Sequence, residues 1–132
     1  MISHVKSFLM AGISIITLDF IWLNYLAKNI YTQQIGKFFS YTKDNQLIVN
    51  YPAAVGVYIL LIVGIMFFVL PKANNSLQAL LYGGLFGGIV YGVYDFTNLA
   101  IIQGWPVPIS FIDMAWGSTV CAATSLITFL LL

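Results

Sequence analysis

The stretch LQALLYGGLFGGIVYGVYDFTNLAII, residues 77–102, decides the fold because it is long, apolar and rich in glycine at helical spacing. A helix that crosses a bilayer needs about 20 mostly apolar residues. This stretch exceeds that length and carries a single charged residue, Asp95. It is therefore predicted to be a membrane-spanning helix with a carboxylic acid inside it.

Three further segments meet the same criterion of length and apolarity: residues 5–27, 52–70 and 107–132. Asn50 is a plausible cap for the second helix, and Pro52 suits its first turn. With 61% hydrophobic and 7% charged residues, the chain has too few charges to cover a water-facing surface. We predict an all-α integral membrane four-helix bundle, with residues 1–132 as one membrane domain and both termini on the same side.

The connection over residues 29–49 is long enough to have a structure of its own. Isoleucine, phenylalanine and tyrosine alternate there with glutamine and lysine. This pattern is typical of an amphipathic segment lying among lipid headgroups, although a plain polar loop is an equal alternative. The net charge of +1 and the absence of a basic run exclude a nucleic-acid footprint.

Glycines form a stripe on the third predicted helix. The pairs 83/87, 84/88 and 88/92 each have the spacing small-x-x-x-small, which lets two helix backbones approach closely in lipid. The partner is either another helix of this chain or a second copy, so the stripe from Gly83 to Gly92 also predicts a possible homodimer.

Three aspartates, Asp19, Asp95 and Asp113, lie inside apolar segments, where an ionised and unpaired carboxylate is costly. The chain has no arginine or glutamate, and its lysines lie at segment ends or in loops. Because successive spans alternate in direction, the three acids are predicted to fall in the same leaflet at similar depths.

Aromatic and amide side chains share the helical faces of these acids. Trp22 follows Asp19 by three residues, and Trp116 follows Asp113 at the same spacing. The candidate ligand-binding residues are Asp19, Trp22, Tyr91, Asp95, Asn98, Asp113 and Trp116. Carboxylates beside aromatic rings suit a metal ion, a shared proton or an organic cation.

Structural roles are the alternatives for the acids. Asp113 follows Ser110 in a Ser-x-x-Asp pattern, which is typical of a capping box at a helix start. Asp19 is also suited to hold helices together by hydrogen bonding to Asn98, Tyr91 or the Trp22 indole.

Four motifs together resemble one family, and they are Leu18-Asp19-x-x-Trp22-Leu23, Tyr94-Asp95-x-Thr97-Asn98-Leu99, Gly104-Trp105-Pro106 and Asp113-x-x-Trp116-Gly117. The pattern is similar to that of a bacterial domain-of-unknown-function family of small predicted inner-membrane proteins with four helices. The resemblance implies a four-helix fold and a multi-pass protein of the bacterial inner membrane, and it implies no established activity. Lysine is the only strong cation of the long loop, where the family leads us to expect arginine too.

The leading hypothesis is a small transporter or binding protein whose intramembrane acids bind a cation or a proton. A membrane enzyme acting on lipid-like substrates is the second hypothesis. The sequence offers it no nucleophile–base pair and no acid repeat for a diphosphate, so it names no catalytic residue or cofactor. The third is an accessory subunit of a membrane complex.

Overall fold

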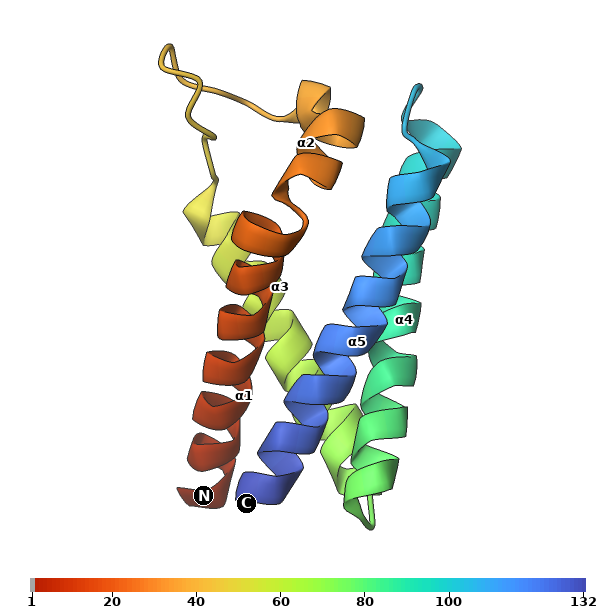
Figure 1. Cartoon of the computed structure of the whole chain (residues 1–132). Coiled ribbons are helices and arrows are strands. Elements are labelled where there is room, and N and C mark those ends of the chain that lie inside the picture. The colour runs from red at the N-terminus through yellow and green to blue at the C-terminus, as the bar shows by residue number, and fades with distance from the viewer. Residues whose placement is uncertain (1) are drawn as a thin grey trace.

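The computed structural model describes residues 2–132 and is built from helices (Figure 1). These are α1 (Ile2–Ile21), α2 (Lys28–Ile35), α3 (Tyr51–Gly64), α4 (Ser76–Ile101) and α5 (Val107–Leu131). Two π-helical turns extend α1 over Trp22–Leu26 and α3 over Ile65–Val69. With these extensions, α1, α3, α4 and α5 are long and apolar enough to cross a membrane, so the predicted all-α four-helix membrane bundle is confirmed.

The N-terminal end of α1 and the C-terminal end of α5 lie at the same end of the molecule (Figure 1). Large apolar side chains on the outside of the bundle are exposed, among them Leu60, Leu85 and Val93. Such a surface is stable in hydrocarbon and not in water. The protein is therefore a multi-pass membrane protein, and the placement of both termini on the same side of the membrane stays a prediction.

Asparagine side chains cap two of the spans. Asn50 Oδ1 accepts a hydrogen bond from the amide of Ala53 at 3.2 Å, and Asn75 Oδ1 accepts one from the amide of Gln78 at 2.9 Å. Each cap satisfies an amide that has no partner within its own helix. The local sequence thus determines where α3 and α4 begin, as predicted for Asn50.

Part of the long connection folds into α2, which lies at the end of the bundle opposite the termini (Figure 1). Tyr31 and Ile35 are its buried residues, and they pack against Ile109 of α5. Gln34 Oε1 also accepts a hydrogen bond from the amide of Ile109 at 2.8 Å. This helix is therefore docked on the start of α5, while its placement among lipid headgroups stays a prediction.

The two helices α4 and α5 form the most closely packed pair. A methyl group at Gly87 would fall on the backbone carbonyl of Gly117, and one at Gly83 would meet Ser125. On the other side of the contact, Gly117 leaves room for the ring of Tyr91. Part of the glycine stripe thus packs within the chain, and the homodimer through the stripe stays a prediction.

An apolar core joins α1 and α3 to α5. Ile15 of α1, Ile62 of α3 and Val120 of α5 are buried in one cluster. The extension Ile65–Val69 carries α3 into contact with α4, whereas α3 itself contacts α1. Farther from this contact, the space between α3 and α4 is a cavity, which is described below.

We expect Gly87→Ala to lower the free energy of unfolding by about 1–3 kcal/mol, because the added methyl group overpacks the α4–α5 contact. Gly56→Ala is the matched control, since nothing lies within 4 Å of a methyl group there. Unfolding of the detergent-solubilised protein would measure both changes. Equal stability of the two variants would contradict the close α4–α5 approach.

Candidate functional site

The carboxylate of Asp19 connects three helices at the end of α1. Tyr58 of α3 donates its hydroxyl hydrogen bond to Asp19 Oδ2. Trp116 of α5 donates from Nε1 to Asp19 Oδ1 at 2.8 Å. Both oxygens of this buried acid are therefore satisfied by neutral donors, which offsets the cost of its burial.

In the two Asp-x-x-Trp motifs, each tryptophan is connected by hydrogen bonds to the aspartate of the other motif. The rings of Trp22 and Trp116 are stacked, with centroids 4.6 Å apart and planes 7° from parallel. Trp116 reaches the acid of the other motif directly, as described above. Trp22 reaches Asp113 through Tyr31: its Nε1 donates to the Tyr31 hydroxyl at 3.2 Å, and that hydroxyl donates to Asp113 Oδ1 at 2.6 Å.

Tyr31 is held as a hydrogen-bond donor by its surroundings. Burial raises the pKa of its phenol above the usual value, and the neighbouring charge of Asp113 raises this pKa further. A neutral phenol has one proton to donate, and here it points to Asp113 Oδ1. The docking of α2 thus fixes the orientation of the Asp113 carboxylate.

The carboxyl group of Asp95, on α4, is in a different situation. The residue is only 1% exposed, and its Oδ2 atom is buried without a hydrogen-bond partner in the described part of the chain. It neighbours the carboxyl group of Asp113. The two acids line a cavity of about 180 Å³ together with Tyr31, Tyr94 and Trp105. That volume is large enough for several water molecules or a small cation.

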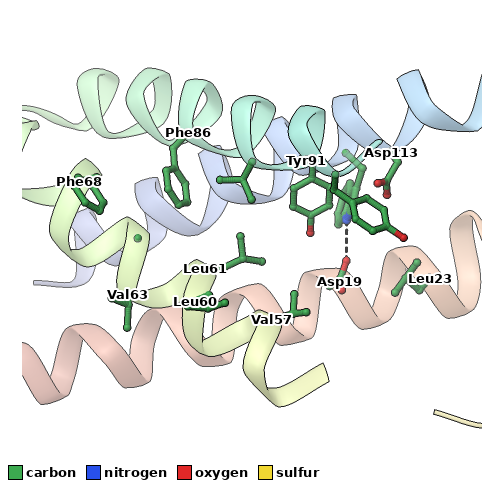
Figure 2. A pocket seen from close by; sticks show the side chains of 14 residues that line it. Asp19, Leu23, Val57, Leu60, Leu61, Val63, Phe68, Phe86, Tyr91 and Asp113 are labelled. Atoms are coloured by element: carbon green, nitrogen blue, oxygen red, sulfur yellow. Dashed lines mark hydrogen bonds between the residues drawn. The ribbon is translucent and has the colours of Figure 1, made fainter. Parts of the chain in front are cut away.

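A larger cavity of about 720 Å³ lies between α3 and α4 (Figure 2). Asp19, Tyr91 and Asp113 gather toward one end of it, and Phe68 and Phe86 lie toward the other. Asp113 lines both cavities, whereas Asp19 lines only the larger one and Asp95 only the smaller. The site is therefore two adjoining spaces that share one acid.

The structure brings most of the predicted site residues together. Asp19, Tyr91, Asp113 and Trp116 line the large cavity, Asp95 lines the small one, and Trp22 stacks on Trp116. Asn98 lines neither cavity, and its carbonyl oxygen accepts the hydrogen bond that ends α4, from the amide of Ile102. Its side chain neighbours that of Tyr94, which lines both cavities, and its place in the site stays a prediction.

The capping-box interpretation of Asp113 is wrong. The helix α5 begins at Val107 with Pro106 as its N-cap residue, so Asp113 lies in the second turn. Ser110 instead donates to the carbonyl oxygen of Pro106 at 2.8 Å. The proline at the second position of the helix moves its start upstream of the Ser-x-x-Asp pattern.

Asp19 does join helices, but not through the predicted partners. Its hydrogen-bond donors are Tyr58 and Trp116, in place of Asn98, Tyr91 or Trp22.

Tyr58 and Tyr31 are two residues of the site that are missing from the set predicted from the sequence. A signal existed for Tyr58, because it carries the only hydroxyl group in the apolar stretch over residues 52–70. Tyr31 gives no such signal, since its role depends on how α2 docks.

Among residues 2–132, no three histidine, cysteine, aspartate or glutamate side chains are grouped as a metal site.

A family model described as "Predicted membrane protein (DUF2177)" matches residues 4–130. This match confirms the resemblance to an uncharacterised family of small membrane proteins. No curated protein and no solved structure matches the chain.

We expect Tyr58→Phe to destabilise the protein by about 1–3 kcal/mol, because Asp19 Oδ2 loses its donor in a buried setting. Tyr51→Phe is the control, since Tyr51 is exposed at the start of the same helix. Unfolding in detergent would measure the difference. If both variants lost the same stability, the Tyr58–Asp19 hydrogen bond would not hold α3 to α1.

Proposed function

We propose that this chain, which belongs to the DUF2177 family of predicted membrane proteins, binds a proton or a small cation between Asp95 and Asp113. The single observation that carries the proposal is the buried Asp95, which lines a cavity together with a second acid and whose Oδ2 has no hydrogen-bond partner among the described residues. We place the protein in the bacterial inner membrane, as a small binding protein or transporter.

The comparison of the two buried acids supports this role. Asp19 has a donor for each carboxylate oxygen, as a purely structural acid requires. Asp95 is buried more deeply, and its buried Oδ2 has no hydrogen-bond partner among the described residues. Two neighbouring carboxyl groups in a medium of low dielectric repel each other unless a proton or a cation lies between them. An accessory subunit held together by polar contacts would leave Asp95 unexplained.

The lack of a positively charged side chain among the described residues of the site also supports a bound proton or cation. No lysine lines either cavity in the described part of the chain. Lys37, on the turn after α2, lies over the ring of Phe38 with its Nζ 5.2 Å from the ring centre. The compensating positive charge for Asp95 and Asp113 must therefore come from a bound proton or ion.

The hydrogen-bond chain from Trp22 through Tyr31 prepares Asp113 for this role. It occupies Asp113 Oδ1 and holds the carboxyl group in one orientation. A preoriented ligand group costs less entropy when the ion binds. The π-helical turn Trp22–Leu26 contributes to this arrangement by placing Trp22 against Tyr31, and such turns are frequent at functional sites.

Infrared spectroscopy tests whether the pair holds a proton. We expect the protein in phosphatidylcholine nanodiscs to show the carbonyl band of a protonated carboxyl group at neutral pH, and Asp95→Asn to lack it. Asp44→Asn is the matched control, because Asp44 is exposed in the loop before α3. A band that is unchanged in Asp95→Asn would overturn the proton assignment.

Thermal unfolding with added cations tests the alternative occupant. A small monovalent cation such as ammonium should raise the melting temperature of the native protein if it binds the folded state, because binding adds to its stability. The same addition should leave Asp95→Asn unchanged. If the native protein shows neither the infrared band nor any cation effect, the proposed function fails.

A further inference from the structure

We propose that the larger cavity binds an amphiphilic organic cation, with its charged head beside Asp113 and Asp19 and its apolar tail between α3 and α4. The proposal deepens the proposed function and rests on it, because Asp113 is the acid that the two cavities share. It names a ligand class for a space that the proton or small cation does not fill.

The apolar part of the cavity has the size and lining of a site for a hydrocarbon chain. Its volume of about 720 Å³ is within the range of small-molecule sites, which span roughly 300–1,000 Å³. Aliphatic and aromatic side chains from both walls line it, including Val57, Leu60, Leu61, Val90, Phe68 and Phe86. In Figure 2 the side chains of Phe86 and Leu61 project into the space from opposite walls.

The polar end of the cavity selects a positive charge. Asp19 and Asp113 contribute carboxylates there, and Tyr91, Tyr94 and Trp116 contribute aromatic rings. The indole N–H of Trp116, one of the donors at this end, is already directed at Asp19. Carboxylates beside aromatic faces attract an ammonium group by charge and by the ring quadrupole.

The cavity is accessible from the lipid phase. Leu60 and Phe68 line it and are themselves 73% and 66% exposed on the outside of the bundle. An amphiphile dissolved in the bilayer thus reaches the space between α3 and α4 without crossing water. Its tail exchanges one hydrocarbon surrounding for another, so the selectivity comes from the head and not from the tail.

The shared acid links the two cavities. A cation that pairs with Asp113 from the large cavity stabilises the charged form of that carboxylate, which opposes a proton held between Asp113 and Asp95. Linkage is reciprocal, so the proton must weaken cation binding by the same factor. The arrangement is suited to exchange of a proton for an amphiphilic cation.

Binding to the protein in phosphatidylcholine nanodiscs, measured by isothermal titration against empty nanodiscs, tests the proposal. The probes are dodecyltrimethylammonium, the neutral dodecyl maltoside with the same tail, and tetramethylammonium as the head alone. We expect saturable binding of dodecyltrimethylammonium and no specific binding of the maltoside. Asp113→Asn should weaken cation binding by about tenfold or more, because the ion pair is desolvated, and Asp44→Asn should leave it unchanged.

A substitution in the wall of the large cavity distinguishes binding of the alkyl tail from binding of the ammonium head. Val90→Trp fills the tail region and should abolish binding of dodecyltrimethylammonium while tetramethylammonium still binds. Val90 lines the cavity from α4, and Leu60→Trp makes the same test from α3 should the first variant fold poorly by circular dichroism. Unchanged binding of the long-tailed cation to either folded variant would overturn the placement of the tail.

The outcomes distinguish this inference from the proposed function. Equal binding of the maltoside and the cation would overturn it, as would an unchanged affinity in Asp113→Asn or no binding of any probe. The infrared band of Asp95 is measured without a ligand, so it reports on the proton site independently. A band that disappears when dodecyltrimethylammonium binds, in the native protein and not in Asp113→Asn, is the expected sign that both sites share Asp113.

Discussion

The pairing of Asp19 with donors from two other helices is the interaction on which the arrangement of the bundle depends. In hydrocarbon there is no water to replace a lost partner, so a buried carboxylate must find its donors within the protein. Tyr58 supplies one from α3, and Trp116 supplies the other from α5. These hydrogen bonds hold together three helices whose apolar surfaces would be solvated equally well by lipid.

The helix α4 packs closely against α5 but only partly against α3, and the space left between α3 and α4 is the large cavity. Gly83, Gly87 and Gly117 bring α4 and α5 close together, because a methyl group at any of them would overlap atoms of the other helix. On the other side, α3 meets α4 near its C-terminal end, where Gly64 lies against Phe86 and the extension Ile65–Val69 contacts α4, and it leaves a cavity beyond that contact. The polar network closes one end of this cavity, so charge and apolar volume are adjacent.

Within the network, satisfied and unsatisfied acids have separate roles. Asp19 is fully hydrogen bonded and acts as a structural joint. Asp113 is oriented by Tyr31 but faces both cavities, and Asp95 keeps a buried oxygen without a partner. This gradation, from complete to incomplete satisfaction, is the reason we propose Asp95 and Asp113 as the ligand-binding pair, because an unsatisfied buried carboxyl group gains most from an ion.

The four spans, the cap at Asn50 and the three acids inside apolar helices were predictable from the sequence, because these features depend on local spacing and composition. Which of these groups meet depends instead on how the helices pack. Helical spacing shows that Trp116 shares a face with Asp113, but not that its indole donates to Asp19 on another helix. It likewise suggests that Asn98 accompanies Asp95, whereas packing leaves Asn98 outside both cavities. The docking of α2 and the divergence of α3 from α4 arise from contacts between distant segments, which no local pattern specifies.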